Sequence, residues 1–277
     1  MTPDQIDVVV RFHDVKRMAE LERCIFSLVG QDYRPVHIIL VVQRFSQADL
    51  ELTRSTLSPL FKGDQAPSFE ILNWEHEVPD DARSMLINLG IRAAKGRFLA
   101  FLDEDQVLYP EAYRLLIAQL RTSGADIAFA GIRRLELEAF GSFVHAKAVL
   151  QSAECKQLRD LFQGTVCPIH SYVIDRTRLP DLFLFFDPYL VVEEGYDFLL
   201  RICAQFRSDF TLGQTVIGED YHKVGSRTGW QGFPGREAQF VEQRRRNTPL
   251  SKPVQRALGV ASPRTRLSIR SFLDGAP

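Results

Sequence analysis

Three consecutive acids, Asp103, Glu104 and Asp105, follow directly after an apolar run at residues 98–102. Such a run predicts a buried strand, and open α/β sheets bind their ligands beyond the carboxyl ends of their strands. If the chain stays extended, period-two alternation points Asp103 and Asp105 to one side and Glu104 to the other. Two converging carboxylates repel each other unless a cation joins them, and their hard oxygen atoms suit Mg²⁺ or Mn²⁺. The pattern therefore predicts a divalent-cation site, with a solvated acidic turn as the alternative.

Alternating strands and helices are expected to position these acids. Runs rich in β-branched and other apolar residues predict strands at residues 6–12, 36–42, 69–72, 98–102 and 125–130. Apolar residues at 3.6-residue spacing predict three helices, after the first, third and fourth of these strands, which are closed by Gly30, Gly96 and Gly124. Asp81 is expected to cap the second helix and Pro110 to begin the third. This alternation predicts an α/β fold with a mostly parallel sheet and helices on both faces.

The second half of the chain is less regular. It predicts a β-ribbon at 132–150 around Gly141, a strand at 170–174, a helix at 194–206 and a glycine- and aromatic-rich loop at 222–235. No linker separates the halves, so we expect a nucleotide-binding half at about 1–105 and a smaller half at about 106–235 to share one core.

The net charge of −1 hides an asymmetry. Residues 236–277 hold nine basic and three acidic residues, a net of +6, whereas residues 1–235 hold 25 basic and 32 acidic, a net of −7. An acidic body is unlike a nucleic-acid-binding domain, whose basic charge lines the folded face. The basic tail is expected either to touch anionic lipid, at about 1 kcal/mol per basic residue, or to form a solvated helix against the acidic body.

Composition also bears on the cellular location. No apolar stretch approaches the length that spans a bilayer, and the N-terminus lacks the features of a signal peptide. The four cysteines show neither zinc-binding nor disulfide-framework spacing: Cys24, Cys155, Cys167 and Cys203. We therefore expect a cytoplasmic protein, with peripheral contact to the inner face of the membrane through the tail as an option.

Three blocks carry a resemblance to a known family. Residues 21–42 read LERCIFSLVGQDYRPVHIILVV, residues 88–113 read NLGIRAAKGRFLAFLDEDQVLYPEAY, and residues 186–202 read FDPYLVVEEGYDFLLRI. In this order they resemble the family-two glycosyltransferases, which have a Rossmann-like GT-A fold. The resemblance implies one GT-A domain at 1–235. It also implies inverting transfer of a sugar from a nucleotide-diphosphate sugar to an acceptor hydroxyl on a polysaccharide, a lipid-linked glycan, a protein or a small molecule.

The resemblance also implies roles for residues on the donor side. Asp103 would contact the nucleotide sugar, and Asp105 would hold Mn²⁺ or Mg²⁺, which neutralises the departing diphosphate. Asp14 stands near the family's polar residue after the first strand, or simply caps the following helix. Gln43 and Arg44 replace acids that the family carries after its second strand. Gln43 offers an amide to a base edge, and Arg44 offers a guanidinium to phosphate or is a solvated loop charge.

The general base departs from the family pattern, because the family's Glu-Asp pair aligns with Glu194 and Gly195. A base must remove the proton of the acceptor hydroxyl in the transition state. The candidates are Glu193, Glu194 and Asp197, and Glu194 is the best aligned. The alternative is that the two glutamates only complement the N-terminus of a helix. Arg201 is expected to pair with an acid.

The last site candidates lie near the end of the domain. His222 could reach the metal or the diphosphate, and the loop at 222–235 could close over the substrates. His145 and His170 have no supporting context.

The alternative function is a non-catalytic module that binds nucleotide-sugar or a partner. Nucleotidyl transfer is less favoured, because the turn after the first strand contains no glycine.

Overall fold

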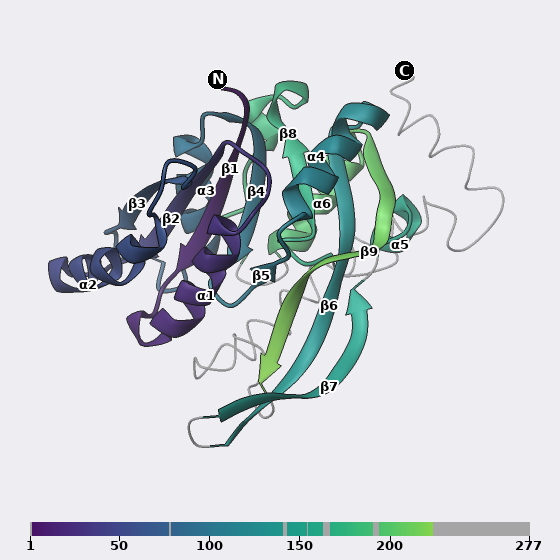
Figure 1. The fold of residues 1–277 in the computed structure, drawn as a ribbon. Coiled ribbons are helices and arrows are strands. Elements are labelled where there is room, and N and C mark those ends of the chain that lie inside the picture. The colour runs from purple at the N-terminus through teal and green to yellow at the C-terminus, as the bar shows by residue number, and fades with distance from the viewer. Residues whose placement is uncertain are drawn as a thin grey trace, which may run out of the picture.

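A mixed sheet organises the protein, as seen in a computed structural model that describes residues 2–77, 79–140, 143–153, 155–162, 167–190 and 194–223. Within these ranges the sheet has nine strands, in the order β3-β2-β1-β4-β8-β6-β9-β5, with β7 paired to β6 (Figure 1). The sheet therefore continues from the first half of the chain into the second.

Four parallel strands form the first half of the sheet: β1 (Thr2–Phe12), β2 (Val36–Gln43), β3 (Ser68–Trp74) and β4 (Gly96–Asp103). Alternate residues of β1 enter opposite core layers, with Val8 and Val10 in one layer and Val9 in the other. This two-sided burial explains why the strands are nearly continuous apolar runs. The prediction of a mostly parallel α/β sheet is confirmed.

Helices cover both faces of the sheet, as predicted (Figure 1). One core layer contains side chains of α1 (Met18–Val29), α2 (Gln47–Leu57) and α4 (Ala112–Ser123). The other contains side chains of α3 (Arg83–Ala93), α5 (Leu158–Phe162) and α6 (Glu194–Cys203). Short 3₁₀ turns complete the helical set: η1 (Val15–Arg17), η2 (Ser58–Leu60), η3 (Arg176–Arg178) and η4 (Asp181–Phe183).

The second half adds the strands β5 (Val107–Leu108), β6 (Ile127–Phe140), β7 (Phe143–Ala153), β8 (Tyr172–Asp175) and β9 (Ser208–Lys223). Strand β8 lies antiparallel between β4 and β6 and joins the two halves. Strands β6 and β7 form the expected ribbon, although its centre at Gly141 lies outside the described residues. Together with β9, this ribbon projects beyond the rest of the sheet (Figure 1).

Element boundaries differ from the predictions at several places. The N-cap of α3 is Ala82 and not Asp81, β8 begins at Tyr172, and α6 ends at Cys203. Helix α3 ends at Ala93, and Gly96 begins β4 instead of closing the helix. A Cβ on Gly96 would lie 2.6 Å from the backbone oxygen of Gln5 and 2.7 Å from Oδ1 of Asp7. The absence of a side chain at Gly96 therefore lets β4 approach β1 closely at this point. Helix α4 begins at Ala112 and not at Pro110.

Several predicted features fall outside the described residues: Glu193, the loop from residue 224 to 235, and the tail at 236–277. The backbone of His222 lies in β9, but its side chain is not described. Among the described helices, none has the length and hydropathy needed to cross a membrane.

Close packing of α3 on β1 leads to a first prediction. A Cβ added to Gly90 would lie 2.3 Å from Cγ1 and 3.1 Å from Cβ of Val9. We expect Gly90→Ala to lower the free energy of unfolding by about 1–3 kcal/mol through overpacking, measured by urea denaturation. Gly195→Ala is the matched control, because in the described part of the chain no atom beyond its neighbours and its own helix backbone lies within 4 Å of the added methyl group. An unchanged midpoint in Gly90→Ala would contradict this helix–strand contact.

Candidate functional site

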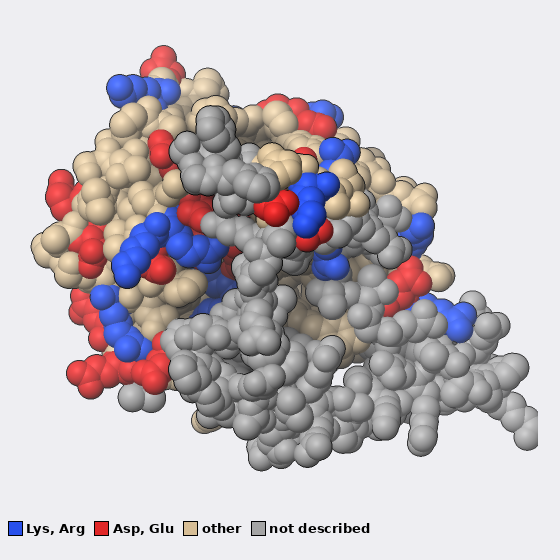
Figure 2. Space-filling view, turned by 90° about the horizontal axis from the view of Figure 1, so that it is seen from below, with Lys and Arg blue, Asp and Glu red and all other residues tan. Residues whose placement is uncertain are grey.

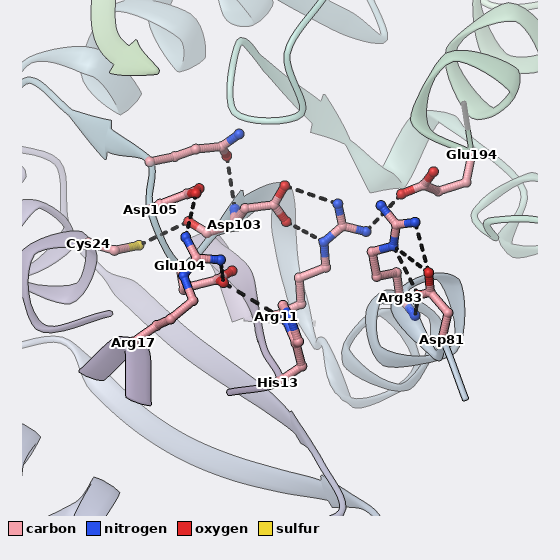
Figure 3. Close-up of polar contacts among 11 residues, drawn as sticks. Arg11, His13, Arg17, Cys24, Asp81, Arg83, Asp103, Glu104, Asp105 and Glu194 are labelled. Atoms are coloured by element: carbon pink, nitrogen blue, oxygen red, sulfur yellow. Dashed lines mark hydrogen bonds and ion pairs between the residues drawn. The ribbon is translucent and has the colours of Figure 1, made fainter. Parts of the chain in front are cut away.

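The candidate site lies where β1 and β4 end side by side. Arg11 near the end of β1 is in register with Asp103, the last residue of β4. Helices α3 and α6 begin nearby with Arg83 and Glu194 (Figure 3). Seen from below the view of Figure 1, acidic and basic side chains lie next to one another on the described surface, not in separate patches (Figure 2).

One guanidinium joins two of the predicted site acids. Nη2 of Arg11 donates to Oδ2 of Asp103 at 3.0 Å, its Nε donates to Oδ1, and its Nη1 donates to Oε1 of Glu194 at 3.0 Å (Figure 3). Burial acts to raise the pKa of Asp103, but the adjacent Arg11 charge and its hydrogen bonds lower that pKa below the ordinary value. The structure thus brings Asp103 and Glu194 together through a residue that the sequence analysis did not select.

The other two acids of the triplet turn toward a different arginine. Nη2 of Arg17 donates to Oδ2 of Asp105 at 2.7 Å, and Nη1 donates to Oε1 of Glu104 (Figure 3). The condition under which Asp103 and Asp105 would point the same way, a chain that stays extended, is not met, because the strand does not continue. It ends at Asp103, where the N–H of Gln106 donates to the Asp103 carbonyl at 3.1 Å and closes a turn.

Negative charge at this turn is not fully compensated. Burial, followed by the charges of Asp105 and Asp103, raises the pKa of Glu104 to about 8 despite the neighbouring Arg17. Burial and the charge of Asp103 also raise the pKa of Asp105 above its ordinary value. A further cation at this position would relieve the repulsion among the three carboxylates.

The donor chemistry of this turn fits a divalent ion. The side chain of Asp105 is 33% exposed and offers hard carboxylate oxygens. Mg²⁺-like ions are commonly held by one or two carboxylates and take their other ligands from water and substrate phosphates. The ranges that the structure describes contain no group of three His, Cys, Asp or Glu side chains that could hold a metal by themselves. Asp105 is therefore a residue whose carboxylate could serve as one ligand of such an ion.

The remaining donor-side candidates lie at strand ends but contact backbone. Asp14 accepts a hydrogen bond from the N–H of Lys16 at 3.0 Å and caps η1, which is the alternative that the sequence left open. Nε2 of Gln43 donates to the carbonyl of Asp80 at 2.7 Å. Nη2 of Arg44 donates to the carbonyl of Pro79 at 2.8 Å. Gln43 and Arg44 thus hold the segment before α3 and lie apart from the acid turn.

Asp197 belongs to a separate ion pair on α6. Nε of Arg201 donates to its Oδ2 at 2.9 Å, and Nη2 of Arg201 donates to the carbonyl of Phe185 at 2.6 Å. The prediction that Arg201 pairs with an acid is confirmed. Among the candidate bases with described side chains, Glu194 joins the Asp103 cluster directly.

His170 is a site residue that the sequence analysis missed. It lies in the turn that leads into β8, and its charge interacts with that of Asp103. The side chain is buried, and neither ring nitrogen has a partner at normal hydrogen-bond geometry within the described residues. Burial lowers its pKa to about 4, against the opposing influence of Asp220 and Asp103. A neutral imidazole therefore lies beside the first acid of the triplet.

Comparisons with known proteins concern the family and the fold of the chain. A model of the glycosyl transferase family 2 matches residues 7–171. No curated protein sequence matches the chain. The crystal structure of S. aureus TarS 1-349 in complex with UDP-GlcNAc has a TM-score of 0.56 at 17% identity, over 81% of this chain and 59% of that chain. The mannosyltransferase PcManGT from Pyrobaculum calidifontis, in complex with GDP-Man and Mn²⁺, has a TM-score of 0.58 at 12% identity, over 98% and 74% of the two chains.

These similarities concern the fold. The matching structures are GT-A glycosyltransferases, and the mixed α/β sheet described above has their architecture. The chain spans about 60% of the length of the TarS 1-349 chain with which it aligns.

The buried imidazole of His170 makes stability depend on pH. Because its pKa is about 4 in the fold and 6.5 in the unfolded chain, the unfolded state binds more protons between these values. The stabilisation of the fold by neutral His170 is thus present above pH 6.5 and is lost as the pH falls toward 4. Between pH 7 and pH 4.5 we expect the free energy of unfolding of wild type to fall by about 2 kcal/mol more than that of His170→Gln. Urea denaturation at both pH values measures the two changes. Equal losses in the two proteins would contradict a buried neutral His170.

Proposed function

This chain belongs to glycosyl transferase family 2, and we propose that it transfers a sugar from a nucleotide-diphosphate sugar to an acceptor hydroxyl, with inversion at the anomeric carbon. The observation that carries the proposal is the meeting of Asp103 and Glu194 on Arg11, next to the acid turn at the end of β4. A donor-side carboxylate and a candidate base are thus held on the same guanidinium.

The donor side is proposed to lie along the ends of β1, β2 and β4. Asp103 contacts the nucleotide sugar, and Gln43 and Arg44 lie at the end of β2, where a base edge and phosphate can reach their side chains. The structural relatives support a nucleotide-sugar donor, since TarS 1-349 was solved with UDP-GlcNAc and PcManGT with GDP-Man and Mn²⁺. The acceptor is proposed to be a hydroxyl of a glycan, a lipid-linked glycan or a protein.

Glu194 is proposed as the general base. Its carboxylate accepts the proton of the acceptor hydroxyl while the acceptor oxygen bonds to the anomeric carbon. The bond from that carbon to the diphosphate oxygen breaks in the same step, and its electron pair leaves with the diphosphate. Attack opposite the leaving group gives inversion.

Asp105 is proposed to hold Mn²⁺ or Mg²⁺. The ion supplies positive charge that neutralises the leaving diphosphate. Arg17, 30% exposed and paired with Asp105, lies where its guanidinium can also meet a phosphate oxygen.

Donor binding gives the first test of this proposal. We expect nucleoside diphosphates and nucleotide sugars to raise the melting temperature, and Mn²⁺ to increase that shift. Asp105→Ala should abolish the Mn²⁺-dependent part because it removes the carboxylate ligand. Asp32→Ala is the matched control: Asp32 is 40% exposed and pairs with Arg114 at 2.7 Å, as Asp105 pairs with Arg17 at 2.7 Å. The absence of stabilisation by any donor would count against the function.

Turnover gives the second test. Glu194→Gln should lower kcat by about 10²- to 10⁴-fold, the range for removal of a general base, in an assay of released nucleoside diphosphate. Asp197→Asn should keep near-normal turnover, because Asp197 is paired with Arg201; Glu193→Gln completes the comparison. Full turnover in Glu194→Gln would remove the base assignment, and donor binding without turnover by wild type would indicate a binding module.

A further inference from the structure

We propose that Arg11 is a positioning residue that fixes the base Glu194 relative to the donor-side carboxylate Asp103, so that one guanidinium sets the geometry of both substrates. The inference rests on the proposed function. It adds a residue whose type and location, inside an apolar strand, had suggested no role.

The first step of the argument is the division of the guanidinium between its partners. Nε and Nη2 of Arg11 donate hydrogen bonds to the two carboxylate oxygens of Asp103, the residue directly across in the neighbouring strand. This fork-to-fork pairing fixes the plane of the guanidinium. Nη1 then lies 3.0 Å from Oε1 of Glu194, so the orientation of Asp103 dictates where Arg11 can bond Glu194 (Figure 3).

The second step is burial. The side chains of Arg11, Asp103 and Glu194 are 11%, 24% and 10% exposed. Ion pairs so little exposed are weakly screened by water and salt, unlike pairs at the surface. Both carboxylates would lose their shared counter-charge if Arg11 were removed, which is costly in a buried site. The contact is therefore a fixed part of the structure.

The third step is the packing beneath the ion pairs. Phe101, two residues before Asp103 on β4, meets Phe198 of α6 edge-to-face with ring centroids 5.9 Å apart. Phe198 also stacks on Phe186 at 4.4 Å. These rings anchor the body of α6 on the sheet, while Arg11 bonds the first residue of the helix. This contact uses Oε1 of Glu194, and Oε2 is the oxygen that the proposed mechanism assigns to the acceptor proton.

Arg83 is a second cation near Glu194. Its charge interacts with Glu194, but its guanidinium hydrogen-bonds to Asp81, with Nη2 2.8 Å from Oδ2. Arg11 carries the direct hydrogen bond to Glu194 that the structure describes.

Arg11→Lys is the decisive variant because it keeps the positive charge. A lysine ammonium is a point charge without the planar fork, and we expect it to stay with Asp103 and release Glu194. The donor KM should then change little while kcat falls roughly 100-fold, the cost of a misplaced catalytic group. The matched control is Arg97→Lys: Arg97 is the second residue of the same strand β4 and bonds the buried Asp175 through Nε and Nη2 at 3.1 and 2.8 Å. This control should keep its kcat.

A double-variant cycle separates positioning from general stability. If Arg11 acts through Glu194, adding Glu194→Gln to Arg11→Lys should cost far less kcat than Glu194→Gln costs in wild type. The melting temperatures of the unliganded Arg11→Gln, Glu194→Gln and double variants should likewise be non-additive. This measurement needs no turnover, and the double variant removes the uncompensated charge on Glu194 that could prevent Arg11→Gln from folding.

The outcomes distinguish this inference from the proposed function. Loss of turnover in Glu194→Gln together with normal kcat in Arg11→Lys would overturn the positioning role and leave the function intact. Equal losses of kcat in Arg11→Lys and Arg97→Lys, or additive melting shifts in the cycle, would also overturn it. Full turnover in Glu194→Gln would instead refute the base assignment itself.

Discussion

Repulsion among carboxylates at the carboxyl edge of the parallel strands is the constraint on which the rest of the site depends. Asp103, Glu104 and Asp105 follow one another in the chain, and Glu194 is brought beside them by α6. Two arginines from the first strand and the turn after it, Arg11 and Arg17, lie between these acids. The site is thus held by cations from one segment of the chain and anions from two others, and it exists only in the folded sheet.

Apolar packing brings these charges within reach. The valines of β1 and the aromatic rings of β4 are buried on both faces of the sheet, so each polar residue at a strand end has a fixed height and direction. The stack of Phe186 on Phe198, together with the edge contact of Phe101, holds α6 over the same face toward which Arg11 and Asp103 point. Hydrophobic burial stabilises the sheet and the helices packed on it, and the ion pairs fix only the final positions of the charged side chains.

The strands around the site could be predicted because two-sided burial leaves long apolar runs, and Asp103 stood out by ending one of them. Helix α2 was missed because its surface is mostly polar, although Ser46 and Asp49 form a capping box that is readable in the sequence. Strand β9 was missed because irregular register breaks its alternation. Arg11 could not be assigned, since its partners lie 92 and 183 residues away and meet it only through strand register and helix docking.

The three consecutive acids at the end of β4 pair with arginines on the two faces of the sheet. Asp103 still belongs to β4 and follows its pleat, so it faces Arg11 and α6 on the side where Glu194 begins. The turn then carries Glu104 and Asp105 to Arg17, which follows β1 on the side of α1. An early end of the strand therefore lets adjacent acids serve different partners. Had β4 continued, Asp105 would have faced the same way as Asp103, and both acids would have competed for Arg11.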